Sequence, residues 1–361
     1  MRKLLLLVVA TCMSIVLSAA NIRPTQLRCE KDSSPLIDVE HPRFSWVNTC
    51  DKQSGKAAQS AYRIRVATSL SGLKSTPVWD SGKQSSAASL NIQYGGERLR
   101  SQQDYWWQVQ VWDSCGKASK WSEPSRFHTG LFSPKEWRGE WIGAPWQGEE
   151  SCDVAGSTDV SPAPLLRTEF TITKPIKSVR FYGTGLGYFE LWCNGKRVGD
   201  DYFAPNQTNY DVRPTLGAQK IAVTDPFNEY LVPYLSYDLT SQVREGTNAF
   251  GAILGNGFYN VVKYWPPLGY GTPRFMGQIE IVYRDGTRET VPTNCSWRAE
   301  KSAIVYDQIY LGEHYDARLE HQGWSEAPMA IQLPLPLSQP MGRTKQMTMP
   351  AMRISQKSIS A

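Results

Sequence analysis

The sequence contains no long stretch with helical periodicity, no run of lysine or arginine, and no C-x-x-C pair. Once residues 1–20 are set aside, the formal net charge is 37 − 34 = +3. So small a surplus argues against nucleic acid or an anionic membrane surface as a partner. Beyond residue 20 no segment is apolar for the roughly 20 residues that a membrane-spanning helix needs.

Six cysteines follow residue 20, and they are scattered along the chain: Cys29, Cys50, Cys115, Cys152, Cys193 and Cys295. Structural zinc sites use closely spaced cysteines, so zinc is not expected. In an oxidising compartment these residues can form disulfides, and Cys29 with Cys50 is the nearest pair in sequence. Buried free thiols are the alternative, and the sequence leaves both open.

The first twenty residues have the layout of a secretory signal peptide. Residues 2 and 3 are basic, residues 4–17 are apolar, and residues 18–20 (Ser-Ala-Ala) are small. This layout predicts cleavage after Ala20 and export to the periplasm or the medium. A lipid anchor on Cys12 is a weaker alternative, because Cys12 lies inside the apolar run.

Aromatic residues are abundant, with 13 tryptophans and 17 tyrosines. Extracellular β-sandwiches use them as core and cross-strand residues, and sugar-binding proteins stack them on pyranose rings. Short alternating segments divided by Gly, Pro, Asn and Asp turns favour strands. In AYRIRVAT (61–68) the alternation places Tyr62 with Ile64 and Val66. In DYWWQVQVWD (104–113) it places Trp107, Val109 and Val111 on one face and Trp106, Gln108, Gln110 and Trp112 on the other.

The segments VWDSGK, YWWQVQVWD and WSEPSRFHT resemble a fibronectin type III-like domain, predicted over residues 21–130. The matching residues are Trp79, Asp80, Trp107, Val109, Trp121, Ser122, Pro124, Phe127 and Thr129. Trp107 and Tyr62 are predicted to be buried in its core. Such domains serve many roles, so the resemblance indicates a fold and not a chemistry.

A connector is predicted over residues 131–164, with a tryptophan-rich first part packed against a domain and a second part in a surface loop. A second β-domain is predicted over residues 165–327. Asn194-Gly195 is a strong hairpin signal, and Asp285-Gly286 is another turn. The number of strands fits two antiparallel sheets, a jelly roll, with Leu191 and Ile253 predicted in the core.

This second domain resembles the N-terminal domain of bacterial α-L-rhamnosidases of glycoside hydrolase family 78. Four blocks carry the match: GYFELWCNGKRVGDD, EGTNAFGAILGNGFY, YRDGTRE and YLGEHYDARLE. The resemblance implies an inverting enzyme that removes terminal α-L-rhamnose from glycans or glycosides, with its catalytic carboxylates in a later (α/α)6 barrel. Residues 328–361 are interpreted as an extended tail that begins a truncated following domain. The chain alone is therefore expected to be inactive.

Inverting hydrolysis needs two carboxyl groups separated by about 6.5–9.5 Å. Glu313 and Asp316 are the candidate pair within this chain, but their spacing predicts opposite faces of a strand, with Arg318 as a salt partner. Together with Asn194 and Gly195 they are interpreted as structural or interdomain residues. No G-x-S-x-G elbow indicates a serine hydrolase.

Family relatives include a carbohydrate-binding module, family 67, that binds rhamnose with calcium on the same jelly roll. Two loops, APNQTNYD and LGNGFYNVVKYW, supply amides, carboxylates and aromatic rings of the kind that sugars and calcium use. The candidate carbohydrate-binding residues are Asn206, Asn209, Asp211, Asn256, Tyr259, Asn260 and Trp265. Ordinary turn chemistry with buried aromatics is the alternative for these residues. Calcium is a candidate cofactor without assignable ligands.

Three functions remain open from the sequence. The first is a scaffold and possible rhamnose-binding region of an exported α-L-rhamnosidase, with rhamnose-containing glycans as partners. The second is an enzyme that acts through its own sandwich. The third is a secreted carbohydrate-binding or adhesion protein without enzyme activity, since fibronectin-like domains often serve in that way.

Overall fold

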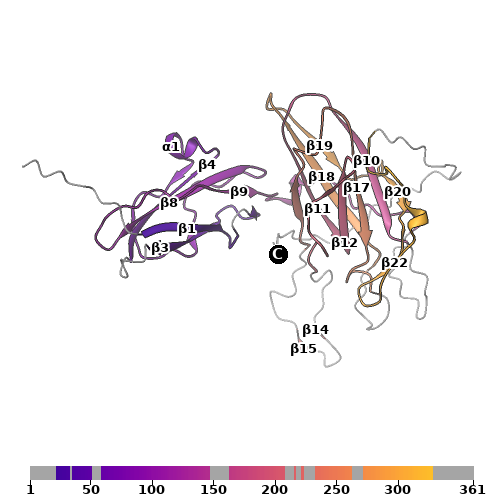
Figure 1. Ribbon diagram of the computed structural model, residues 1–361, viewed down its shortest axis with the longest axis horizontal. Helices are drawn as coiled ribbons and strands as arrows, with labels where there is room; N and C mark the ends of the chain where they lie inside the picture. Colours follow the sequence, from indigo (N-terminus) through magenta and orange to yellow (C-terminus); the bar gives the residue numbers. More distant parts are fainter. Residues whose placement is uncertain are drawn as a thin grey trace, which may run out of the picture. The chain divides into compact units, whose positions relative to one another are not determined.

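The computed structural model describes eight segments, residues 22–32, 35–50, 58–146, 162–207, 215–216, 221–222, 232–261 and 271–327. They belong to two compact units, unit 1 ending at Thr129 and unit 2 beginning at Gly130 (Figure 1). Strands dominate both units. The helical elements of the described segments are α1 (Gly72–Ser75), η1 (Pro134–Glu136) and η2 (Ala317–Leu319). The predicted all-β class is confirmed, while the predicted signal peptide and tail lie outside the described residues.

Unit 1 is a sandwich of two sheets. One sheet has the order β1–β3–β7, with β1 (Ile22–Cys29), β3 (Arg43–Cys50) and β7 (Ile92–Gln93). The other has the order β2–β9–β8–β4–β5, with β2 (Leu36–Ile37), β9 (Ser125–Thr129), β8 (Asp104–Asp113), β4 (Gln59–Ala67) and β5 (Trp79–Asp80). A short strand, β6 (Gln84–Ser85), also pairs with β4. This arrangement of two packed sheets agrees with the predicted fibronectin type III-like sandwich.

Aromatic side chains fill the space between the two sheets of unit 1. Phe44 from β3 meets Trp107 from β8 with 4.5 Å between ring centroids, and both are fully buried. The alternation predicted for β8 is confirmed, because Trp107, Val109 and Val111 are buried. Tyr62 was predicted to be buried but is half-buried. Its ring contacts Trp46, and it lies next to a register shift at the start of β4, between Gln59 and Ala61.

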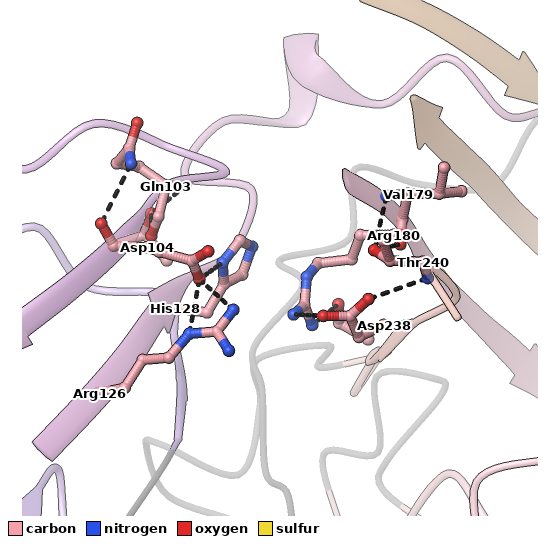
Figure 2. A network of polar contacts seen from close by, with 10 residues as sticks. Gln103, Asp104, Arg126, His128, Val179, Arg180, Asp238 and Thr240 are labelled. Atoms are coloured by element: carbon pink, nitrogen blue, oxygen red, sulfur yellow. Dashed lines mark hydrogen bonds and ion pairs between the residues drawn. The ribbon is translucent and has the colours of Figure 1, made fainter. Parts of the chain in front are cut away.

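A polar cluster ties the start of β8 to β9 (Figure 2). The Asp104 carboxylate accepts hydrogen bonds from the Arg126 guanidinium at 2.9 and 3.2 Å, and its Oδ1 lies 2.8 Å from His128 Nδ1. Burial by itself raises the pKa of Asp104, but the bonds and charges of His128 and Arg126 outweigh burial and lower that pKa to about 2. Asp104 is therefore an ionised anchor at ordinary pH.

Unit 2 consists of two antiparallel sheets that stack as layers (Figure 1). The first has the order β13–β12–β17–β10–β20: β13 (Lys196–Val198), β12 (Tyr188–Cys193), β17 (Gly246–Gly255), β10 (Pro164–Ile172) and β20 (Arg298–Lys301). The second has the order β16–β11–β18–β19: β16 (Leu235–Asp238), β11 (Ile176–Leu186), β18 (Arg274–Tyr283) and β19 (Arg288–Pro292). Two separate pairs are β14 (Thr215–Leu216) with β15 (Ile221–Ala222) and β21 (Ile304–Gln308) with β22 (Gly312–Tyr315).

The core of unit 2 lies between its two sheets. Phe181 contacts Phe250 across the layers at 5.0 Å between centroids, and Leu191 is buried as predicted. The burial predicted for Ile253 is wrong, because Ile253 is half-buried on the outer face of β17 while Ala252 and Leu254 face the core. A shift of one residue in strand register moves every side chain to the other face, and the apolar run AFGAIL does not indicate which register holds.

Residues 131–144 run along the second sheet of unit 2. The backbone amide of Arg138 donates to Gln278 Oε1 at 2.6 Å, and Ile142 forms a β-bridge with Phe275. The two backbones approach closely, since a Cβ on Gly139 would lie 2.3 Å from the Gly277 carbonyl oxygen. This first part of the predicted connector is thus packed against β18 as expected. Most of its second part, residues 147–161, lies outside the described segments.

No disulfide joins the cysteines of the described segments to one another. Cys29 and Cys193 are buried, and Cys50, Cys115 and Cys295 are exposed. The Cys29–Cys50 disulfide considered above is contradicted, because Cys29 pairs with Phe44 and Cys50 with Ile22 at opposite ends of the β1–β3 ladder. Seven residues along a strand span about 23 Å at about 3.3 Å each, whereas bridged Cα atoms lie within about 7 Å.

Candidate functional site

A cleft of about 530 Å³ opens in unit 2 near the start of β12 and the end of β17. Tyr188, Glu190 and Ile253 contribute outward-facing side chains to it, and the hairpin β21–β22 supplies a second wall. Its lining comes from segments that are far apart in sequence: Tyr188, Phe189, Glu190, Tyr202, Phe203, Ile253, Leu254, Gly255, Gly257, Ile304, Asp307, Gln308, Ile309, Gly312 and Glu313. A cleft of this size accommodates a small ligand such as one or two sugar rings.

Two aromatic residues stand at the rim of the cleft on a short loop after β13. Tyr202 is 73% exposed and Phe203 is 71% exposed. Phe203 meets Tyr188 edge to face at 5.7 Å, and the Arg197 guanidinium lies 4.7 Å from the Tyr202 ring centroid. The loop is fixed by the Phe189 amide, which donates to the Ala204 carbonyl at 2.9 Å. Exposed rings on a fixed backbone provide a surface for stacking.

The carboxylate of Asp307 is clamped at the end of β17. It accepts the Asn256 backbone amide at 3.0 and 3.1 Å and the Asn256 side-chain amide at 2.5 Å. Burial raises the pKa of Asp307, the bonds from Asn256 oppose that rise, and the negative charge of Glu313 adds to it. Oδ2 of Asp307 lies over Gly255, where an added Cβ would be 3.1 Å from it.

Two further carboxylates line the cleft. Glu313 in β22 pairs with Asp307 across the hairpin, is exposed, and has no side-chain hydrogen bond or ion pair with any residue that the structure describes. Glu190 in β12 forms a 3.3 Å ion pair with Arg197. The cleft therefore combines aromatic surfaces with carboxylate acceptors, one clamped, one ion-paired and one open to solvent.

The predicted carbohydrate-binding residues divide into two groups. Asn256, Tyr259 and Asn260 are buried. Asn256 and Asn260 contact the hairpin through Asp307 and Gln308, whereas Tyr259 packs against Leu186 and Val232. Asn260 Nδ2 donates to Asn256 Oδ1 at 2.6 Å, so these amides hold the cleft wall together. Asn206 is half-buried, and the other three, Asn209, Asp211 and Trp265, lie outside the described residues. Their role in sugar binding stays a prediction.

Sequence reasoning did not select five residues that form the cleft, namely Tyr188, Glu190, Tyr202, Phe203 and Asp307. One signal was available for two of them. The strand YFELWC alternates, and its outward-facing positions include Tyr188 and Glu190. The adjacent aromatics Tyr202 and Phe203 directly after two aspartates were a second signal, since large aromatics in a polar turn segment can form a contact surface.

Four of the family-motif residues, Asn194, Gly195, Asp316 and Arg318, make local turn, capping and ion-pair contacts. Asn194 and Gly195 form the β12–β13 turn with φ of 48° and 80°, as two-residue hairpins of this type require. Asp316 caps η2 and forms an ion pair with the Arg318 guanidinium at 2.6 Å. Arg318 is therefore the salt partner of Asp316, as predicted. Asp316 lies beyond the end of β22 and does not join Glu313 in the cleft lining.

Within the described segments, no group of three or more His, Cys, Asp or Glu side chains is placed to hold a metal ion. Two oxygen donors from the predicted loops, Asn209 and Asp211, are outside these segments, so calcium stays a prediction.

Two family models match the chain. The "Rha78A-like, N-terminal immunoglobulin domain" matches residues 24–133, and the "Alpha-L-rhamnosidase N-terminal domain" matches residues 174–229 and 224–356. The second match falls on the unit that contains the cleft. Together the two matches give the order of domains that the sequence predicted, with a sandwich domain first and a rhamnosidase N-terminal domain second.

Curated relatives give the same result. An alpha-L-rhamnosidase from Formosa agariphila is 33% identical over 315 residues, which are 81% of this chain and 31% of that protein. One from Alteromonas sp. (strain LOR) is 35% identical over 312 residues, 84% of this chain and 32% of that protein. The chain thus spans about a third of the length of these relatives.

Solved structures extend the likeness to three dimensions. The alpha-L-rhamnosidase from Dictyoglumus thermophilum superposes with a TM-score of 0.76 at 30% identity, over 93% of this chain and 35% of that one. The enzyme from Streptomyces avermitilis gives 0.74 at 25% identity, over 86% of this chain and 44% of that one. Family models, curated sequences and folds agree, and the chain belongs to the α-L-rhamnosidase family, whose N-terminal region it matches.

Proposed function

We propose that this chain forms the non-catalytic N-terminal region of an exported α-L-rhamnosidase, which removes terminal α-L-rhamnose from glycans. In this proposal both units act as scaffold, and the cleft of unit 2 binds terminal L-rhamnose weakly. The observation that carries the proposal is the convergence of Tyr188, Tyr202 and Phe203 with the carboxylates of Asp307 and Glu313 in one cleft. The relatives' names supply the sugar, since all are alpha-L-rhamnosidases and the Streptomyces avermitilis structure is described as complexed with L-rhamnose.

The chemistry of the cleft suits a deoxy sugar. L-rhamnose carries a methyl group and apolar ring faces, which can lie against an aromatic side chain, and hydroxyl groups that donate to carboxylates. Glu313 is an open acceptor, and Tyr202 is an exposed ring at the rim. The cleft is shallow and wide compared with one sugar ring, so few contacts form. A dissociation constant on the order of 0.1–1 mM is expected.

A non-catalytic role is supported by the state of the carboxylates. Asp307 accepts bonds from both nitrogens of Asn256, which holds its carboxylate against the wall of the cleft. A general acid or base must be free to exchange a proton with the substrate. The matched relatives are also about three times longer than the matched region, which leaves room in them for a catalytic domain elsewhere.

Export is supported by residues 1–20, whose basic, apolar and small segments follow the order of a signal peptide. No helix among the described residues is long and apolar enough to cross a membrane. The small net charge of the chain argues further against nucleic acid as a partner.

Titration calorimetry of the purified chain with methyl α-L-rhamnoside, with and without calcium, tests the binding proposal. Tyr202→Ala is expected to weaken binding about tenfold, because it removes a stacking surface. Tyr315→Ala is the matched control, since Tyr315 is 54% exposed but is not part of the cleft lining. Equal losses in both variants, or no binding to the unmodified chain, would contradict a rhamnose site in the cleft.

A further inference from the structure

The charged side chains that line the cleft are all acidic. They are Glu190, Asp307 and Glu313, and they come from three different strands. Arg197 compensates part of the charge of Glu190 through the 3.3 Å ion pair. Asp307 and Glu313 have no basic partner among the described residues, since Asp307 is held by neutral amide groups of Asn256. The wall formed by the hairpin is therefore net negative.

A negative wall distinguishes between sugars by their charge. Hydroxyl groups donate hydrogen bonds to carboxylates, so a neutral sugar meets acceptors that it can satisfy. A uronic acid brings a carboxylate, which cannot donate and is repelled by like charges. The repulsion is moderated because Glu313 is exposed and salt screens exposed charges over about 8–10 Å. Discrimination is thus expected to depend on ionic strength.

The cleft is also larger than one pyranose ring needs, since its volume is about 530 Å³. Its lining includes the aromatic residues Tyr188 and Phe203 as well as Gly312 and Glu313 of the hairpin. A rhamnose unit stacked on the rim aromatics leaves space beside the hairpin for the residue to which it is linked. Glu313 is then the charged group that faces this second residue.

Building on the proposed rhamnose site, we infer that the cleft accepts terminal rhamnose linked to a neutral sugar and disfavours rhamnose linked to a uronic acid. The ligand class is a neutral rhamnosyl glycan or glycoside. The discrimination comes from Glu313 together with Asp307, and Glu190 contributes less because Arg197 is its partner.

Two disaccharides that differ in one group test this inference. They are α-L-rhamnosyl-(1→4)-D-glucose and α-L-rhamnosyl-(1→4)-D-glucuronate, titrated into the purified chain. At about 20 mM ionic strength we expect the neutral disaccharide to bind about tenfold more tightly. At about 0.5 M salt the ratio is expected to fall below about threefold, because the Debye length shortens to roughly 4 Å.

Glu313→Gln keeps the shape of the side chain and removes its charge, so it is expected to reduce the low-salt ratio to about threefold or less. Glu245→Gln is the matched control, because Glu245 is exposed on unit 2 and does not line the cleft; it should leave the ratio at about tenfold. Equal or tighter binding of the glucuronate compound overturns the inference and leaves the rhamnose site standing. Failure of both disaccharides and of methyl rhamnoside to bind overturns both.

Discussion

Asp307 and Glu313 are paired across the β21–β22 hairpin, and their carboxylates have opposite surroundings. Asp307 is held by both nitrogens of Asn256, whereas Glu313 is exposed to solvent. The first carboxylate fixes the hairpin to the end of β17, and the second remains available to a ligand. This pair connects the stability of unit 2 to the shape of its cleft.

Asn256→Ala is expected to destabilise unit 2 by about 2–3 kcal/mol, because it removes the side-chain donor to a buried carboxylate. The free energy of unfolding from urea titration is the measurement. Adding Asp307→Asn to this variant should recover part of the loss, since a neutral amide costs less to leave unpaired than a charge. A loss below about 0.5 kcal/mol for the single variant would show that the side-chain bond from Asn256 to Asp307 does not stabilise unit 2.

Unit 1 is expected to lose stability in acid through Asp104. Its pKa is about 2 in the folded chain and 3.8 in the reference state, so its contribution is complete above about pH 4 and is lost as the pH falls from there toward 2. Tryptophan fluorescence during urea unfolding at several pH values measures this. Asp104→Asn should flatten the pH dependence of the free energy of unfolding in this window. An unchanged slope would contradict a role for Asp104 and would assign the acid sensitivity to other carboxylates, such as Asp80, whose pKa is also about 2.

Trp107→Ala is expected to cost about 3–5 kcal/mol, because Trp107 is fully buried against Phe44. Trp112→Ala, on the outer face of the same strand, should cost only about 1 kcal/mol, through its contact with Lys83. Chemical denaturation of both variants makes the comparison. Similar losses would mean that the inward and outward faces of β8 are wrongly assigned.

The purified chain is expected not to hydrolyse an aryl α-L-rhamnoside above background. The reason is that the clamped Asp307 and the open Glu313 do not provide a free acid and base in one cleft. Release of the chromogenic aryl group is the readout. Turnover that persists through repurification and disappears in Glu313→Gln would refute the non-catalytic assignment.

Local patterns predicted the strands and turns of this chain well. The period of two in residues 104–113 gave the inward face of β8, and Asn194-Gly195 gave the hairpin turn, because both depend on neighbouring residues alone. Ile253 was placed in the core wrongly, since strand register depends on the partner strand. The interpretation of Glu313 as structural did not include its place in the cleft.

The cleft itself was beyond prediction from local patterns. It is assembled from residues 188–190, 202–203 and 304–313, which only the folded chain brings together. The predicted loops pointed to the correct end of unit 2 through Gly255 and Asn256, but the amides there are buried as donors within the wall. Residue type suggested the chemistry, and tertiary packing decided which groups face the ligand.

Chemical-shift mapping of the chain with L-rhamnose tests the central proposal most directly. At saturating sugar the account predicts shifts in the amides of residues 188–190, 202–203 and 304–313, with a dissociation constant on the order of 0.1–1 mM. Residues on the outer face of β8 in unit 1 serve as the internal reference and should not move. Saturating L-rhamnose that leaves all three cleft segments unshifted would contradict a sugar-binding role for this unit.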